Sequence, residues 1–256
     1  METLEKPGNS IDANGEVVLS IANLKKSFGN KVVLKDISME LHAGENLVVL
    51  GKSGQGKSVT IKCIVGLLQQ DGGSCNVYGK EVKDLSDDEL RDLRVKVGFL
   101  FQSGALYDSM SVRDNLSFPL TRVLKMKKTS EINKLVEEML ENVGLQDAID
   151  KMPADLSGGM RKRIGVARTL IMRPQIMLYD EPTTGLDPIT SKEISELIIT
   201  MQRKYKTSSI IITHDMACAK ITADRILVMN EGVFVEHGTY DELEHSENEL
   251  VRAFFK

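Results

Sequence analysis

The sequence has 256 residues, of which 41% are hydrophobic and 27% are charged, and these values are typical of a globular protein. This length suits one large domain, or one domain with an inserted subdomain. The formal net charge of −4 at pH 7 gives no electrostatic reason to expect a nucleic-acid partner. Two basic clusters are each expected to be a solvated helix face: Lys125, Lys127 and Lys128, and Arg161, Lys162 and Arg163.

Neither the cysteines nor the N-terminus indicates secretion. Cys63, Cys75 and Cys218 lack CxxC spacing, and an odd number without a disulfide framework is typical of a reducing compartment. Each is expected to be a small buried residue. Residues 1–16 are polar, so we expect a flexible tail and no signal peptide. No apolar run reaches the about 18 residues that a membrane helix needs, which predicts a cytoplasmic protein that docks on a membrane only through a partner.

The first predicted elements are β-strands. Runs at 18–21 and 32–34 flank a turn at 28–30, and 37–41 alternates with period two as a half-exposed strand does. Segment 46–50 is an apolar run that leads into a glycine-rich loop, which indicates a strand buried on both faces of a sheet.

The glycine-rich loop at 51–58 reads GKSGQGKS and fits the pattern GxxxxGK[ST]. Its glycines let successive N–H groups point at phosphate oxygens, and the helix expected after it adds a positive N-terminal end. Lys57 is predicted to reach the β- and γ-phosphates, and the Ser58 hydroxyl to bind Mg²⁺. The strand–loop–helix context disfavours the alternative, a turn without a ligand. The predicted nucleotide-binding residues here are Gly51, Ser53, Gly54, Gln55, Gly56, Lys57, Ser58 and Val59.

The middle of the chain is predicted to be helical. Apolar residues recur with helical spacing from Ile132 to Val143, and Gly144 closes the segment. Residues from about 103 to 170 contain no convincing β-like run. We therefore expect a helical subdomain inserted into an α/β core.

A second phosphate-binding surface is predicted at the end of this insertion. Ser157 is a good helix N-cap, and Gly158 and Gly159 expose N–H groups at the positive end of the helix. A plain capped helix is the alternative. Because the chain then has two phosphate-binding surfaces and one catalytic carboxylate, we infer that this surface serves the ATP of another molecule.

The C-terminal half alternates strands with helices. Strand-like runs at 176–179, 209–212 and 226–229 are separated by helical patterns at 191–204 and 216–222. This alternation predicts a parallel sheet with helices on its faces.

Two carboxylates follow the first of these strands. Asp180 could hold Mg²⁺ through its water shell, and Glu181 could orient and deprotonate an attacking water. A solvated acidic turn is the alternative, which the position of the pair after the phosphate loop disfavours.

Taken together, these motifs resemble those of ABC ATPases. The phosphate loop, Gln102, the sequence LSGG at 156–159, Asp180-Glu181, GLD at 185–187 and His214 occur in the order found in that family. The resemblance covers about residues 18 to 245. It implies an α/β fold for residues 17–256, with a RecA-like parallel-sheet core, an antiparallel β subdomain and the inserted helical subdomain.

The resemblance also implies roles for individual residues. Phe28 falls where the family stacks an aromatic ring on adenine, with a core phenylalanine as the alternative. Gln102 matches a glutamine that contacts the metal and water, and His214 matches a histidine that contacts the γ-phosphate. Asp187 matches a residue that communicates across the dimer. Val59 replaces a threonine of many relatives, which should cost a hydrogen bond at most.

In this family two chains pack head to tail, so that Lys57 of one chain and Ser157 of the other contact the same ATP. The resemblance therefore implies a homodimer that binds ATP and Mg²⁺. Its reaction would be an in-line attack by water, with charge stabilised by Lys57, His214, the metal and the opposing helix.

Three segments, 101–112, 156–163 and 179–190, resemble the ATPases of Mce-associated lipid transporters of the maintenance-of-lipid-asymmetry type. This implies multi-span permease subunits and an Mce-domain lipid-binding protein as partners, and phospholipid as cargo. It implies a peripheral location at the cytoplasmic face of a bacterial inner membrane. Four apolar residues could line the permease cleft or belong to the core of the helical subdomain: Leu106, Tyr107, Met110 and Phe118.

Three other functions stay open. The chain could energise another ABC importer or exporter, or act as a soluble ABC ATPase such as one for iron–sulfur cluster assembly. A module that senses ATP without cleaving it is disfavoured because Glu181 and His214 are both present. The apolar residues at 249–256 could pack on a partner chain or on the chain's own core.

Overall fold

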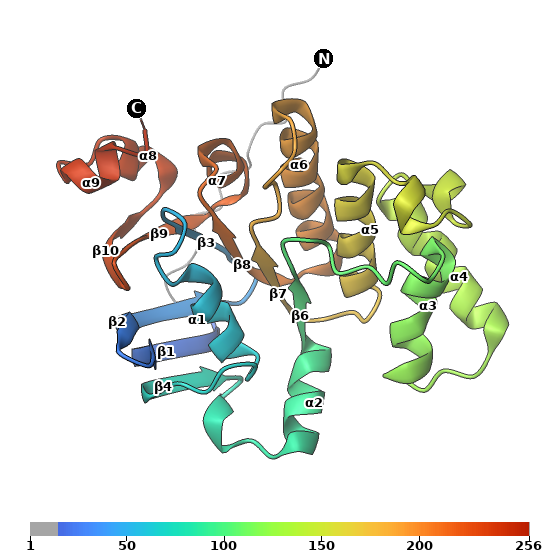
Figure 1. Ribbon diagram of the computed structural model, residues 1–256, viewed down its shortest axis with the longest axis horizontal. Helices are drawn as coiled ribbons and strands as arrows, with labels where there is room; N and C mark the ends of the chain where they lie inside the picture. The colour runs from blue at the N-terminus through green and yellow to red at the C-terminus, as the bar shows by residue number, and fades with distance from the viewer. Residues whose placement is uncertain (1–14, 256) are drawn as a thin grey trace.

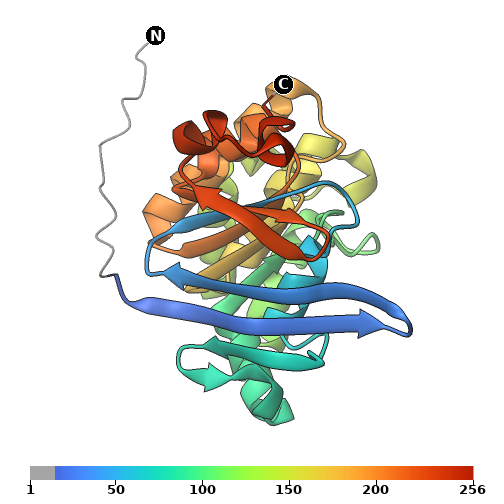
Figure 2. The same cartoon turned by 90° about the vertical axis from the view of Figure 1, so that its left-hand side faces the viewer.

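The computed structural model describes residues 15–255 (Figure 1). The predicted tail, residues 1–16, therefore lies outside the described residues except for Gly15 and Glu16. One sheet has six strands in the order β10-β9-β3-β8-β7-β6, and the other has four in the order β2-β1-β4-β5. Figure 2 shows the long strands β1 and β2 as a layer of their own, apart from the strands of the larger sheet.

The larger sheet is parallel except for its edge strand β10, which pairs antiparallel with β9. Its residues pair so that Leu50 lies opposite Thr213 and Asp180 opposite Ile212. Because carboxyl ends of parallel strands meet at one edge, the residues that follow β3, β6, β7 and β8 are brought together there. The strands are β3 (Asn46–Leu50), β6 (Val97–Leu100), β7 (Ile176–Asp180), β8 (Ser208–Thr213), β9 (Arg225–Asn230) and β10 (Val233–Gly238).

The smaller sheet is antiparallel and contains β1 (Val17–Phe28), β2 (Lys31–His42), β4 (Gly72–Val77) and β5 (Lys80–Glu81). The predicted runs at 18–21, 32–34 and 37–41 are all parts of β1 and β2, which are longer than the patterns indicated. The turn between them, Gly29-Asn30, places Gly29 at a φ of +57°, a conformation that glycine adopts at low cost.

Helix α1 (Lys57–Ile64) lies between the two sheets (Figure 1). Its Ile61, Cys63 and Ile64 are fully buried in a core cluster that contains residues of both sheets. Burial of these side chains fixes α1, and with it the loop at its N-terminus, against the end of β3.

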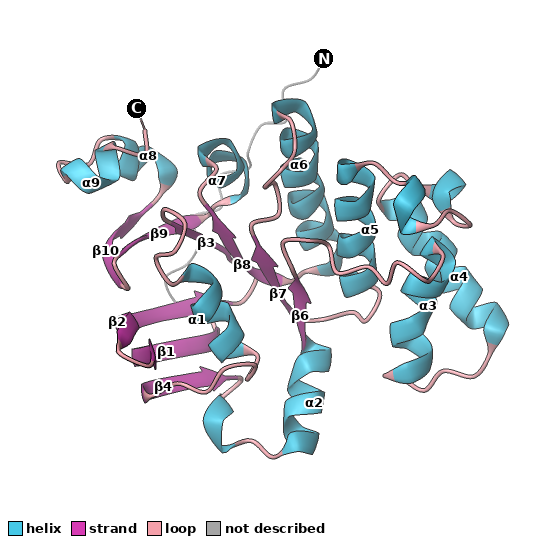
Figure 3. Cartoon of the chain, in the orientation of Figure 1, coloured by secondary structure: helices cyan, strands magenta, loops and turns pink. Residues whose placement is uncertain are grey.

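The remaining helices flank the larger sheet, and α3, α4 and α5 gather on one side (Figure 3). All residues from 103 to 170 are described, and they contain helices but no strand, as the sequence predicted. Gly144, at a φ of +68°, follows α4 as expected for a glycine stop. The helices are α2 (Asp87–Lys96), α3 (Val112–Arg122), α4 (Thr129–Asn142), α5 (Gly158–Leu170), α6 (Pro188–Tyr205), α7 (Met216–Thr222), α8 (Tyr240–Glu244) and α9 (Glu249–Arg252).

Both predictions about the basic clusters need correction. Lys125, Lys127 and Lys128 are exposed, but they lie in the connection between α3 and α4 and not on a helix. In the other cluster Arg161 is exposed, whereas Lys162 is only 6% exposed. The physical reason is that Lys162 shares a face of α5 with buried residues such as Val166, one helical turn further on.

The C-terminal segment packs on the chain's own core. Val251 is fully buried, and Phe254 and Phe255 pack against the core cluster that also contains α6 and α7 residues. Of the four apolar residues whose place was open, Leu106 packs against that same cluster, and Met110 and Phe118 are partly buried. Tyr107 is 42% exposed, with its ring centroid 5.1 Å from that of Phe118. Within residues 15–255, no helix has the length and apolar character needed to cross a membrane.

Candidate nucleotide-binding site

A cavity of about 320 Å³ lies at the carboxyl edge of the larger sheet, where β3, β6, β7 and β8 end. Two of its lining residues, Val33 and Thr184, were not predicted as site residues. The others were predicted from the sequence and come from four separate stretches of chain: Ser53, Gly54, Gly56, Lys57, Ser58, Val59, Gln102, Glu181 and His214.

The phosphate loop depends on its glycines. Gly54 and Gly56 have φ values of +80° and +106°, which strongly favour glycine. A Cβ atom on Gly56 would lie 2.7 Å from Leu34 Cδ2 and 3.1 Å from the Val33 oxygen, so β2 also excludes a side chain there. Helix α1 begins at the next residue without a side-chain cap, so no side chain occupies the N–H groups of its first turn.

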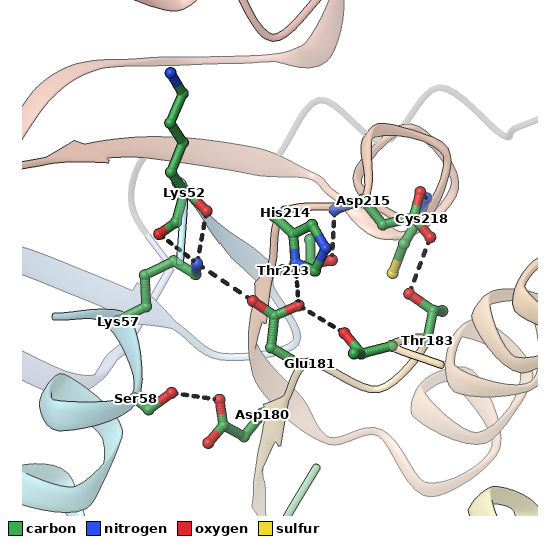
Figure 4. Close-up of polar contacts among 12 residues, drawn as sticks. Lys52, Lys57, Ser58, Asp180, Glu181, Thr183, Thr213, His214, Asp215 and Cys218 are labelled. Atoms are coloured by element: carbon green, nitrogen blue, oxygen red, sulfur yellow. Dashed lines mark hydrogen bonds and ion pairs between the residues drawn. The ribbon is translucent and has the colours of Figure 1, made fainter. Parts of the chain in front are cut away.

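Lys57 is buried, with 4% of its surface exposed. Its Nζ donates to the oxygens of Gly51 and Lys52, at 2.6 and 3.1 Å, and forms an ion pair with Glu181 Oε1 at 3.2 Å (Figure 4). An ammonium group at this depth needs such partners to offset the loss of water. The ion pair places the predicted phosphate-binding lysine against the predicted catalytic base.

Glu181 is held at each of its polar atoms. Its N–H donates to the Ile212 oxygen at 2.9 Å, and its Oε2 lies 2.7 Å from His214 Nδ1 and accepts from Thr184 Oγ1 at 3.1 Å. Its backbone oxygen accepts from Lys162 Nζ at 3.2 Å. The residue has a φ of +51°, which is strained for a side chain of this kind and persists only where neighbours over-determine it. The carboxylate is therefore fixed in direction before any ligand binds.

Ser58 and Asp180 form a pair of oxygen groups, with Ser58 Oγ donating to Asp180 Oδ1 at 2.7 Å (Figure 4). Burial raises the pKa of the Asp180 carboxyl, and the hydrogen bond from Ser58 opposes that shift. A hydroxyl and a buried carboxylate side by side fit a hard cation such as Mg²⁺, whose charge would stabilise the carboxylate. No group of three or more His, Cys, Asp or Glu side chains with metal-site geometry occurs within 15–255, so such a cation would need phosphate or water oxygens as well.

Several predicted residues lie outside the cavity lining. Ser157 caps α5 by accepting from the Met160 N–H at 3.2 Å, as predicted. Asp187 caps α6 by accepting from the N–H groups of Ile189 and Thr190, both at 3.0 Å. The two helix starts are in contact, because a Cβ on Gly159 would lie 2.5 Å from Thr190 Cγ2. None of the residues of the second predicted phosphate surface, Ser157 to Gly159, lines the cavity of the phosphate loop.

Three more predicted nucleotide-binding residues, Phe28, Gly51 and Gln55, also lie outside the cavity lining. Phe28 ends β1 and is 47% exposed, with Lys26 Nζ 5.5 Å from its ring centroid, which excludes the alternative of a core phenylalanine. Gly51 accepts from Lys57, as described, and Gln55 Oε1 accepts from the N–H of Glu231 at the β9–β10 turn.

Lys162 is a residue that sequence reasoning missed. Its Nζ donates to the oxygens of Gln102 and Glu181, at 2.6 and 3.2 Å. Burial lowers the pKa of its ammonium group, and the nearby carboxylates of Glu181 and Asp180 oppose that shift. Its position one turn before the apolar Val166 is the signal that could have placed it on the buried face of α5.

Comparison with known proteins supports the motif analysis. The family model described as ABC transporter matches residues 34–184. The "Probable ribonucleotide transport ATP-binding protein mkl" of Mycobacterium leprae is 40% identical over 238 residues, which are 93% of this chain and 68% of that protein. The chain thus spans about two thirds of the length of this relative. The chloroplastic protein TRIGALACTOSYLDIACYLGLYCEROL 3 of Arabidopsis thaliana is 37% identical, over 95% of this chain and 75% of that protein.

A solved structure shows the same fold. The ATP-binding cassette MJ0796, described as a dimer in a post-hydrolysis state bound to ADP and Pi, matches with a TM-score of 0.78 and 29% identity, over 87% of this chain and 98% of that one. The family model covers more than half of the 256 residues. The chain therefore belongs to the ABC transporter family and is one of its ATP-binding, ATP-hydrolysing components.

Proposed function

We propose that this chain is the ATPase subunit of a membrane transporter that moves lipid, and phospholipid in particular, through a partner permease. The observation that carries the ATPase part is the arrangement of Lys57, Glu181 and His214 around one cavity, beside the Ser58–Asp180 pair. Support for lipid cargo comes from the three segments that resemble Mce-associated transport ATPases and from the Arabidopsis relative, whose name is that of a lipid. The mycobacterial relative is named for ribonucleotide transport, so the cargo needs a direct test.

In the proposed reaction, the phosphate loop binds the triphosphate of ATP and a water attacks the γ-phosphorus. The bond to the oxygen that bridges the β- and γ-phosphorus breaks, and ADP and phosphate are released. The γ-phosphate competes with Glu181 for the Lys57 ammonium, and this frees the carboxylate to accept a proton from the water. His214, 2.7 Å from Glu181 Oε2, keeps the carboxylate oriented.

Ser58, Asp180 and Gln102 would hold Mg²⁺, and a bound Mg²⁺ would neutralise charge on the phosphates. Phe28 would stack on adenine, which its exposure at the end of β1 permits. These assignments treat residues 17–256 as one ATPase domain with a helical subdomain at about 103–170.

The working unit in this proposal is a homodimer. Ser157, Gly158, Gly159 and Asp187 lie away from the chain's own cavity and would contact ATP bound to a second copy. Ile189, which follows Asp187 at the start of α6, is 74% exposed, as suits a surface that a partner covers. The dimeric state of MJ0796 supports this arrangement.

The permease would dock in a groove of about 720 Å³ lined by residues of α2, β6, α3 and α5. None of the four residues considered for the permease cleft from the sequence lines this groove: Leu106, Tyr107, Met110 and Phe118. Its lining carries five cationic side chains and one carboxylate, so the docking segment should be acidic. The ATPase would then sit at the cytoplasmic face of a bacterial inner membrane, with an Mce-domain protein beyond the permease. The charged residues of the groove are Arg91, Arg94, Arg122, Lys125, Arg168 and Asp92.

Affinity purification from detergent-solubilised membranes of the native host would test this function. We expect a multi-span permease, an Mce-domain protein and phospholipid to co-purify with the tagged chain, as identified by mass spectrometry. A different permease would retain the transport ATPase and exclude the lipid cargo. A chain recovered without any membrane partner would contradict the transporter and favour a soluble ABC ATPase, such as one for iron–sulfur cluster assembly.

A further inference from the structure

The buried lysine of α5, Lys162, connects two parts of the molecule that lie far apart in sequence. Its Nζ is 2.6 Å from the oxygen of Gln102, which follows β6, and 3.2 Å from the oxygen of Glu181, which follows β7. Glu181 receives one further backbone contact, from the N–H of Thr184 at 3.3 Å. The Lys162 side chain is 6% exposed, and its two hydrogen-bond acceptors are both main-chain oxygens. A buried lysine of this kind does not act as a surface charge, so we infer that it serves to hold these two backbone segments in place.

Two further contacts bind the segment after Gln102 to the same face of α5. A Cβ on Gly165 would lie 2.9 Å from the Gly104 oxygen, so α5 and this segment touch through their backbones. Arg168 Nη1 donates to the Ala105 oxygen at 2.8 Å, and its guanidinium lies 4.7 Å from the ring centroid of Tyr107. These α5 residues recur every three positions, so one helix face follows the segment from 102 to 107.

We propose that Lys162 is a positioning residue for hydrolysis, which fixes the backbone of Glu181 relative to Gln102 and so couples movement of α5 to the catalytic carboxylate. The proposal rests on the proposed function, in which Glu181 is the base. Its geometric basis is that Lys162 Nζ donates hydrogen bonds to the backbone oxygens of both Gln102 and Glu181, which follow different strands. A shift of α5 pulls on the Glu181 oxygen, and the strained backbone there converts a small shift into a change in carboxylate direction.

The first test compares Lys162→Met and Lys162→Arg in the full-length chain. The Met variant removes the donor but keeps much of the apolar volume, whereas Arg keeps donors at a different reach. We expect Met to lower kcat by about 10- to 100-fold with ATP affinity changed by less than about 3-fold, and Arg to lose less. Lys134→Met, at an exposed position on α4, is the matched control and should hydrolyse ATP like the wild type.

A double-mutant comparison separates positioning from a general structural role. If Lys162 acts through Glu181, then Lys162→Met should lower the single-turnover rate of Glu181→Gln by less than about 3-fold. A double variant whose rate is reduced by the product of the two single-variant effects would overturn the proposal. A Lys162→Met variant whose kcat stays within about 3-fold of wild type would overturn it as well. If the Met variant does not fold, the same comparison with Lys162→Arg decides.

These outcomes are distinct from failure of the proposed function. Absence of hydrolysis by the wild-type chain, alone and with its membrane partners, would refute the ATPase assignment itself. An active wild type together with a fully active Lys162→Met would refute only the role of Lys162.

Discussion

The chain presents two helix N-termini with glycines, at α1 and at α5, and they are built in opposite ways. Helix α1 follows a loop with two left-handed glycines and has no side-chain cap, and its first residues, Lys57 and Ser58, line the chain's own cavity. Helix α5 has an ordinary cap from Ser157, and its start lies outside that cavity. Both ends carry the same positive helix dipole. The difference teaches that only the α1 terminus opens into a cavity of its own chain, and in the proposed dimer the α5 terminus would contact the ATP of a second chain.

The largest expected effect comes from removing the carboxylate at the complete site. Glu181→Gln should lower kcat by about 10²- to 10⁴-fold, because the amide cannot accept the proton of the attacking water. ATP affinity should be kept, and the dimer should persist with ATP bound. Single-turnover hydrolysis and size-exclusion chromatography with ATP would measure both. Undiminished turnover would exclude Glu181 as the base.

Lys57→Ala tests the same site through binding. We expect ATP affinity to fall by about 10- to 100-fold, as for the loss of charge-assisted hydrogen bonds. Lys52→Ala is the control from the same loop, since the Lys52 side chain is exposed and points away from Glu181 (Figure 4). Titration with a fluorescent ATP analogue would compare the two variants. Equal affinities would contradict the role of Lys57.

Ser157→Ala addresses the α5 terminus, with Ser86→Ala as its match. Ser86 caps α2 as Ser157 caps α5, each accepting from the N–H three residues on. Both variants should therefore lose about 1 kcal/mol of unfolding free energy. Only Ser157→Ala should also lower hydrolysis, by about 10-fold, because only this hydroxyl is proposed to contact ATP of a second chain. Denaturant unfolding and steady-state ATPase assays would measure the two effects, and equal activities would remove Ser157 from the site.

The smallest expected effect is a change in Tm on substitution of Asp187. Hydrogen bonds from Thr190 hold the pKa of its carboxyl below the ordinary value of 3.8. A lowered folded-state pKa means that the ionised form stabilises the fold above the unfolded pKa, and this contribution is lost as the pH falls through the folded pKa. Asp187→Asn should therefore lower the Tm slightly at pH 7, and the difference should shrink below pH 3.8. A Tm difference independent of pH would contradict this.

Sequence patterns predicted the parts of the site that are contiguous or that end a strand. The phosphate loop was recognisable because its glycines and Lys57 lie within eight positions, and Asp180 and Glu181 because they follow an apolar run. The strand β6 was not predicted, since four residues that include a glycine give too weak a pattern. Helix α2 was not predicted either, although it has ten residues, because most of them are charged and few are apolar. The roles of Phe28, Gln102, His214 and Asp187 in nucleotide chemistry stay predictions.

The sequence by itself determined the family, the order of the motifs and the parallel sheet, because motifs and the alternation of strand and helix patterns are local properties of the chain. Only the tertiary structure decided that Lys162 is buried between Gln102 and Glu181 and that Thr184 holds the carboxylate. The physical reason is distance along the chain. Gln102 and Lys162 are 60 positions apart, and contacts of that kind depend on how α5 packs against the sheet, which no local pattern encodes.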